Sequence, residues 1–187
     1  MKNSLTLFLS LFLVTISLAQ TPTATQNQGG NPRQTPGQAG PGVAGQQADN
    51  LEQVRGELEE GIKHLLVTQI EAWNRGDLEG FMTGYWHSPE LTFFSGINIA
   101  KGWQAALQRY QRTYQGTGKQ MGTLEFQNLN IDLLSRQAAV VTGKWQLTMS
   151  DGKKPHGLFT LILKRMQPGW RIVHDHTSSE EHSAVSN

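Results

Sequence analysis

The chain has 187 residues, with 16 Lys and Arg against 15 Asp and Glu, so it is close to neutral at pH 7. A neutral chain without clusters of lysine and arginine lacks the electrostatic character of a protein that binds nucleic acid or an anionic membrane. The absence of cysteine excludes disulfides, thiolate chemistry and a cysteine-linked lipid anchor, so a folded domain must be stabilised by its core. The sequence also lacks a glycine-rich phosphate loop and a nucleophile elbow, which leaves phosphoryl transfer and covalent hydrolysis without support.

The first 50 residues contain two segments that we do not expect to belong to a folded domain. Residues 1–19 are typical of a signal peptide, because Lys2 precedes an apolar run and Ser17-Leu18-Ala19 supplies the small residues of a cleavage site. We therefore expect an exported protein, periplasmic or extracellular, that has no contact with the membrane after cleavage. Residues 20–50 are rich in Gln, Gly, Pro, Thr and Ala, a composition that predicts a linker.

Helical patterns dominate the next part of the chain. Between residues 51 and 74, apolar residues recur on one helical face, and Gly76 stands where helices commonly end in the left-handed conformation. Asp77 is a typical N-cap for a second, short helix that passes through Phe81 to Trp86. A third helix is predicted to begin after Gly102.

Alternation of apolar and polar residues predicts the strands of a sheet. We expect a short strand over residues 91–94 and four longer ones over residues 123–134, 138–149, 157–166 and 170–177. Helices followed by a run of antiparallel strands indicate an α+β domain, with one face of a curved sheet covering the first helix. The predicted domain spans residues 51–179, and residues 180–187 form a polar tail.

The last predicted strand carries titratable groups within an apolar pattern. Because side chains alternate along a strand, one face is expected to carry Trp170, Ile172, His174 and His176. Burying imidazoles costs free energy unless partners or water compensate, so the histidines predict a cavity on this face. Asp175 falls on the opposite face, where we expect it to pair with a basic residue.

Two segments of the chain resemble a known family. Ala72-Trp73-Asn74-Arg75-Gly76-Asp77 and Gly169-Trp170-Arg171-Ile172-Val173-His174-Asp175-His176-Thr177-Ser178 resemble a SnoaL-like domain of the nuclear transport factor 2-like superfamily. The ending is especially similar to the association domain of calcium/calmodulin-dependent protein kinase II, although Thr177 stands where that motif has arginine. The resemblance implies a cone-shaped α+β fold, with three N-terminal helices packed on a curved, mainly antiparallel sheet. It also implies a pocket at the wide end and a homodimer formed through the outer face of the sheet.

The pocket implied by the resemblance is expected to bind a flat, apolar ligand. The residues expected to line it lie near the ends of their elements or on the last strand: Tyr85, Trp86, Trp103, Tyr110, His174 and His176. Trp73 and Trp145 are assigned to the core, whereas Lys101 and Arg109 are expected to be solvated.

The sequence leaves three functions open. The first is an exported domain that binds a small, largely apolar molecule as a homodimer, without a cofactor and without established catalysis. The second is a cofactor-independent isomerase or dehydratase that uses His174 or His176 as its catalytic base. The third is a dimeric assembly domain with a vestigial pocket. His174 and His176 could also bind a metal with His87 or His156, but we expect no metal.

Overall fold

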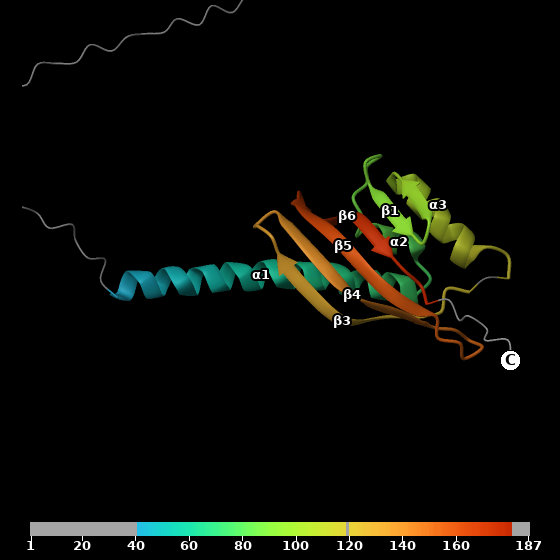
Figure 1. Cartoon of the computed structure of the whole chain (residues 1–187), viewed down its shortest axis with the longest axis horizontal. Helices are drawn as coiled ribbons and strands as arrows, with labels where there is room; N and C mark the ends of the chain where they lie inside the picture. Colours follow the sequence, from blue (N-terminus) through green and yellow to red (C-terminus); the bar gives the residue numbers. More distant parts are fainter. Residues whose placement is uncertain (1–40, 119, 181–187) are drawn as a thin grey trace, which may run out of the picture. The chain divides into compact units, whose positions relative to one another are not determined.

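The computed structural model describes residues 41–118 and 120–180 of the chain. The predicted signal peptide, residues 20–40 of the predicted linker and the tail after Glu180 lie outside the described residues. The described part belongs to one compact unit, and Figure 1 shows the order of its elements. They are α1 (Pro41–Asn74), α2 (Leu78–Met82), β1 (Thr92–Ser95), β2 (Asn98–Lys101), α3 (Trp103–Tyr110), the π-helical turn η1 (Gln111–Gln115), β3 (Thr123–Leu133), β4 (Ala138–Thr148), β5 (His156–Met166) and β6 (Gly169–Thr177).

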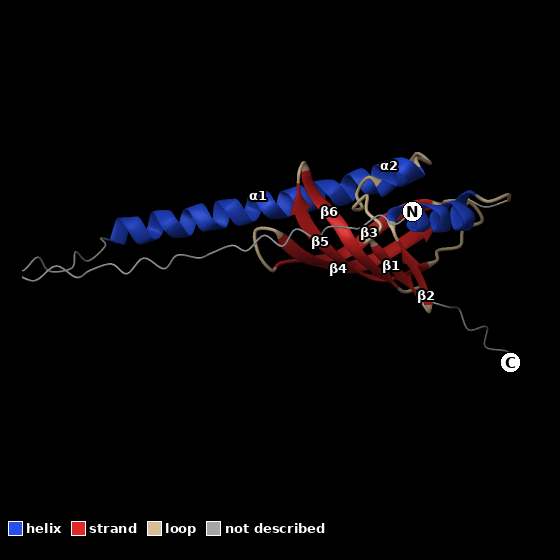
Figure 2. Ribbon diagram, turned by 90° about the horizontal axis from the view of Figure 1, so that it is seen from above, coloured by secondary structure: helices blue, strands red, loops and turns tan. Residues whose placement is uncertain are grey.

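The strands form one sheet in the order β2-β1-β6-β5-β4-β3. Every neighbouring pair is antiparallel except β1 and β6, which run parallel. The sheet is curved and does not close on itself, and α1 lies along one of its faces (Figure 2). The α+β class with a mainly antiparallel sheet, as predicted from the sequence, is confirmed.

The core fills the space between α1 and the inner face of the sheet. Side chains at helical spacing on α1 meet alternating side chains of the central strands, which is the packing that the two periodicities predict. The members with the least exposure include Ile62, Leu66, Val141, Leu163 and Ile172. Burial of these apolar surfaces is the main stabilising contribution in a chain without disulfides.

Helix α1 begins at Pro41, whereas the sequence pattern predicted its start at Leu51. Its first part projects beyond the strands (Figure 1), and Leu51 is 61 % exposed. Residues 44–50 are exposed, so this part has no buried face that would give the sequence an apolar periodicity, and the pattern could not locate the true start. Although α1 has 34 residues, neither it nor any other helix within the described residues is apolar enough to cross a membrane.

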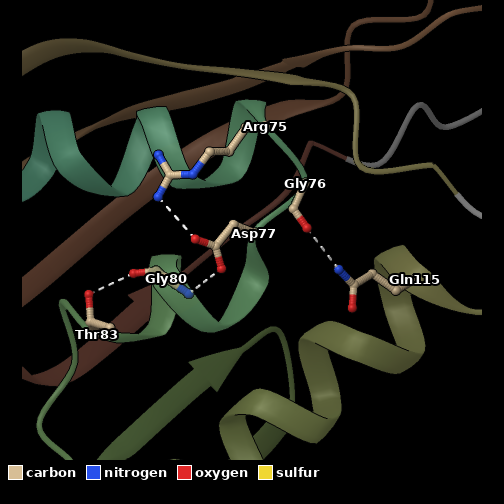
Figure 3. A network of polar contacts seen from close by, with 6 residues as sticks. All are labelled: Arg75, Gly76, Asp77, Gly80, Thr83 and Gln115. Carbon is tan, nitrogen blue, oxygen red and sulfur yellow. Dashed lines mark hydrogen bonds and ion pairs between the residues drawn. The ribbon is translucent and has the colours of Figure 1, made fainter.

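The junction between α1 and α2 follows the predicted capping residues (Figure 3). Gly76 has a φ of +80°, the left-handed conformation that glycine adopts without strain. Asp77 caps α2 by accepting a hydrogen bond from the Gly80 amide at 2.7 Å, and Arg75 donates to its other oxygen at 3.0 Å. Gln115 of η1 donates to the Gly76 carbonyl oxygen at 3.2 Å, which ties the junction to the third helical segment.

Helix α2 ends at Met82, earlier than the predicted end at Trp86. The chain leaves the helix because its backbone pairs with β6. The Trp86 amide donates to the Ile172 carbonyl at 2.8 Å, and the Ile172 amide donates to the Gly84 carbonyl at 2.9 Å. This pairing holds Tyr85 directly against the last strand.

Strand β2 was not predicted from the sequence. It pairs with β1 across a turn at Gly96, and it carries Ile99 at 68 % exposure. An edge strand whose side chains are mostly solvated has no buried face, so it leaves no alternating pattern in the sequence.

Candidate functional site

A β-bulge in β6 decides which side chains of this strand face the interior. In the register with β5, Leu163 is opposite Ile172, whereas Ile162 is opposite His174. Two consecutive residues of β5 therefore pair with Ile172 and His174, and Val173 between them has no partner on β5. A bulge of this kind interrupts the alternation of faces along the strand.

Before the bulge the even-numbered residues of β6 face the interior, and after it the odd-numbered residues do. Trp170 and Ile172 are buried before it, and Asp175 is buried after it, at 3 % exposure. His174 and His176 consequently lie on the outer face. The prediction that the two histidines share a face with Ile172 is wrong, and so is the prediction that Asp175 points outward to a basic partner.

The two histidines form a cluster with β1 on the outer face. His174 Nδ1 lies 2.6 Å from Thr92 Oγ1, and the His174 ring meets the Phe94 ring edge-on at 4.8 Å between centroids. Partial burial, followed by the charge of His176, lowers the pKa of His174. Within the described residues, no three His, Cys, Asp or Glu side chains are grouped so that they could hold a metal ion.

A cavity of about 260 Å³ lies inside the curved sheet. Along β4, the inner face passes from the core residues Ala139 and Val141 to the cavity residues Trp145 and Leu147. Another side of the cavity is closed by Gln69 and Trp73 of α1 and by Phe81 of α2. The volume is just below the usual range of ligand pockets, about 300–1,000 Å³, which favours a small ligand.

The cavity walls are chemically different on its two sides. Strands β3, β4 and β5 supply an apolar wall made of Leu124, Phe126, Trp145, Leu147, Phe159 and Leu161. Most polar groups come from β1, β6 and the segment of α3 and η1, including Ser95, Arg109, Tyr110, Thr113, Asp175 and Thr177. The cavity therefore matches a molecule with one apolar end and one polar end.

Asp175 is the centre of the polar wall. The Tyr85 hydroxyl donates to one carboxylate oxygen at 2.7 Å, and the Thr177 hydroxyl donates to the other at 2.6 Å. The Tyr110 hydroxyl lies 3.3 Å from that of Tyr85. When Asp175 is ionised, Tyr85 gives it its only proton, so Tyr110 must donate to Tyr85. The lone pairs of the Tyr110 oxygen then remain for a ligand.

Burial sets the protonation of this network. It raises the pKa of Asp175 to about 6, although hydrogen bonds from Thr177 and Tyr85 act in the opposite direction. Burial, followed by the charge of Asp175, also raises the pKa values of Tyr85 and Tyr110 well above their ordinary value, so both phenols stay protonated at neutral pH. Asp175 can thus gain or lose a proton near neutrality, whereas the two tyrosines can only pass one on.

The structure brings together only some of the residues that the sequence assigned to the pocket. Tyr85 and Tyr110 line the cavity, but Trp86, Trp103, His174 and His176 do not. Trp103 instead donates from Nε1 to the Met82 carbonyl oxygen at 2.9 Å and packs its ring against His87. It thereby anchors α3 to the end of α2.

Sequence reasoning placed Asp175, Trp145 and Arg109 away from the cavity, whereas Trp73 belongs both to the core, as predicted, and to the cavity wall. Asp175 was placed on the outer face because the bulge leaves no mark in the sequence. Trp145, assigned to the core, is half-buried on the cavity wall and donates from Nε1 to the Ser178 carbonyl oxygen at 2.9 Å. Arg109, expected to be solvated, is half-buried with its guanidinium 5.5 Å from the centre of the Phe93 ring.

Comparisons with known proteins agree with this architecture. A family model described as SnoaL-like domain matches residues 62–180. A nuclear transport factor 2-like protein of unknown function from Shewanella oneidensis MR-1 is 37 % identical, with a TM-score of 0.60, and the match covers 64 % of this chain and 98 % of that one.

More distant structures share the fold. A nuclear transport factor 2-like superfamily protein from Salmonella enterica serovar Typhimurium is 22 % identical, with a TM-score of 0.52, over 73 % of this chain and 98 % of that one. A cystatin-like fold protein of unknown function from Nostoc punctiforme is 10 % identical, with a TM-score of 0.56, over 68 % and 95 % of the two chains. No curated protein matches the chain.

Proposed function

Because the chain belongs to the SnoaL-like domain family, we propose that its cavity binds a small, largely apolar molecule that carries a polar group at one end. The observation that supports this function is the two-sided cavity, in which an apolar wall of β3 to β5 faces the Asp175 network. The apolar wall would contribute most of the binding free energy by burial, and the polar wall would orient the ligand.

The proposal predicts that filling the cavity prevents binding. We take 2-naphthamide as the probe, a neutral molecule with a two-ring apolar body and one polar end. Leu161→Phe adds volume on the inner face of β5, where Leu161 is 4 % exposed and lines the cavity. We expect this variant to bind the probe at least about tenfold more weakly than the wild type in calorimetric titrations, because its ring occupies the space of the ligand.

A matched control is an exposed leucine that lies outside the cavity. Leu134, just after β3, is 61 % exposed and does not line the cavity, so Leu134→Phe should bind the probe as the wild type does. Thermal melts establish that both variants are folded. If Leu161→Phe binds normally, or if Leu134→Phe loses binding instead, the ligand does not occupy this cavity.

A second function, a cofactor-independent isomerase or dehydratase, is favoured by one observation. Asp175 is a buried carboxyl whose pKa of about 6 lies near neutrality, as suits a general base. It would take a proton from a carbon next to a ligand carbonyl. The protonated Asp175 then donates to Tyr85 and Tyr85 to Tyr110, so that Tyr110 can donate to the enolate oxygen that forms. Asp175 takes the role that the sequence gave to His174 or His176, because neither histidine lines the cavity.

Proton exchange tests this second function. The protein should accelerate deuterium exchange next to the carbonyl of 2-tetralone, with a rate that rises with pH around the Asp175 pKa of about 6, because the carboxylate is the base. Asp175→Asn should remove about 10²-fold or more of the acceleration. The exposed Asp132 provides the control variant Asp132→Asn. Equal rates in the two variants would exclude Asp175 as the base.

We further propose that the protein is exported and acts as a homodimer. The apolar run that precedes Ser17-Leu18-Ala19 supports export. Leu158 and Ile162 are exposed at 57 % and 37 % on the outer face of β5, which supports contact with a second copy there. The third function, an assembly domain with a vestigial pocket, is less favoured because side chains do not fill the cavity, which has a volume of about 260 Å³. N-terminal sequencing and light scattering of the exported protein test both proposals.

A further inference from the structure

Among the described residues that line the cavity, Arg109 is the one that carries a positive charge. It lies in the last turn of α3, next to Tyr110 in the chain, and lines the same cavity as Asp175. Its guanidinium carbon is 5.5 Å from the centre of the Phe93 ring, so the group rests on an aromatic face. Stacking of this kind uses the flat face of the guanidinium and leaves its N–H donors directed outward at the edge.

The donors of Arg109 have no acceptor among the residues that the structure describes. Its side chain takes part in no hydrogen bond there and in no ion pair with a carboxylate. Asp175, the one acidic side chain among the described residues of the cavity wall, accepts its hydrogen bonds from Tyr85 and Thr177 instead. The cavity thus holds a positive charge whose hydrogen-bonding capacity is free.

The positive charge of Arg109 lies on the polar side of the cavity. Phe93 is opposite Asp175 in the register of β1 and β6, so Arg109 stands above the polar side and away from the apolar wall. Its charge also reaches the neighbouring phenols: burial raises the pKa of Tyr110 and of Tyr114, and Arg109 opposes that rise in both. Ser95, two residues after Phe93 on β1, adds a hydroxyl to the same side.

From this geometry we infer that the ligand is a small organic acid, whose apolar body lies on the wall of β3 to β5 and whose carboxylate is bound by Arg109. The inference rests on the proposed binding function and narrows it to one chemical class. An Arg–carboxylate pair in a half-buried cavity forms charge-assisted hydrogen bonds, which are stronger than neutral ones. A neutral amide of the same shape offers the guanidinium only one uncharged carbonyl oxygen, so its hydrogen bonds to Arg109 are weaker.

An isosteric pair of probes separates the contribution of charge from that of shape. 2-Naphthoate and 2-naphthamide share the same apolar body and differ in the charge of the polar end. In calorimetric titrations at neutral pH, the wild type should bind 2-naphthoate at least about tenfold more tightly than 2-naphthamide, which corresponds to about 1.4 kcal/mol. Arg109→Gln should remove this preference while it leaves the affinity for 2-naphthamide within a factor of about two, since the variant loses only the charged contact.

Arg112→Gln is the matched control. Arg112 lies on the adjacent turn, is exposed and does not line the cavity, so its loss changes the net charge equally but should preserve the preference for 2-naphthoate. Equal losses in the two variants, or no preference in the wild type, would overturn the acid assignment while binding of 2-naphthamide still upholds the cavity. If the wild type binds neither probe, the binding function itself fails.

Discussion

Replacing Trp73 with alanine is expected to lower the free energy of unfolding by about 3–5 kcal/mol, the usual range for a buried aromatic side chain. Trp73 is 3 % exposed and meets the rings of Phe81 and Tyr114 edge-on, at 5.1 and 4.8 Å between centroids. Its Nε1 group also donates to the Gly122 carbonyl oxygen at 3.1 Å, which ties α1 to the segment before β3. Urea denaturation of the wild type and the variant measures the loss.

The same substitution at Trp145 is expected to cost less unfolding free energy. Both tryptophans were assigned to the core from the sequence, but Trp145 is half-buried on the cavity wall. Trp145→Ala enlarges an existing space and should cost only about 1–2 kcal/mol, mostly from lost wall contacts and the hydrogen bond to Ser178. Equal losses in the two variants would show that the cavity is filled and that Trp145 is a core residue.

Asp175→Asn is expected to become more stable relative to the wild type as the pH rises. The pKa of Asp175 is raised from 3.8 to about 6 on folding. Between these values, the folded state keeps a proton that the unfolded state has released, so raising the pH destabilises the wild-type fold. The full effect is about 3 kcal/mol, because each unit of pKa corresponds to about 1.4 kcal/mol. The destabilisation of the wild type is absent below the unfolded pKa of 3.8 and reaches its full size above the folded pKa of about 6.

Denaturant unfolding of wild type and variant over this pH range measures the effect. All other carboxyl groups are common to the two proteins, so the difference between their pH profiles isolates Asp175. Asp132→Asn, at an exposed position on β3, should follow the wild-type profile. A constant difference between the wild type and Asp175→Asn across the range would mean that the Asp175 pKa is not raised by folding.

A destabilising carboxyl in the interior is itself informative about function. The pH prediction implies that, above the folded pKa, the fold is more stable with an uncharged residue at position 175. The inner faces of the neighbouring strands carry the apolar residues Phe93 and Leu161 at the paired positions. Groups whose burial lowers stability are characteristic of sites where ligands are bound or protons are moved. This is the physical basis for placing the site at Asp175.

The sequence predicted those parts of the fold that have a local or periodic cause. Gly76 and Asp77 act as predicted because capping depends on residues within one turn. The four long strands were located to within two residues because one face of each is buried. Edge strand β2 and the first part of α1 were missed because neither buries a face.

The candidate site was predicted less well, for one dominant reason. A single extra residue, Val173, reverses the direction in which every later side chain of β6 points. Asp175 therefore faces the cavity, and His174 and His176 face outward. Nothing in the local sequence distinguishes Val173 from a regular strand residue, although β6 pairs with β5 on both sides of the bulge and with β1 only after it. Tyr85 and Tyr110 line the cavity as predicted, but Tyr85 is held there by the backbone pairing of residues 84–86 with β6, which the sequence did not predict.

The central claim is that the ligand site is the cavity at Asp175 and not the histidine cluster on the outer face. A crystal structure of the protein soaked with 2-naphthamide tests it most directly. We predict electron density for the naphthyl rings against Trp145 and Phe159, with the amide group within hydrogen-bonding distance of Tyr110. Density for the probe beside His174 and Phe94, with the cavity closed by side chains, would contradict the claim.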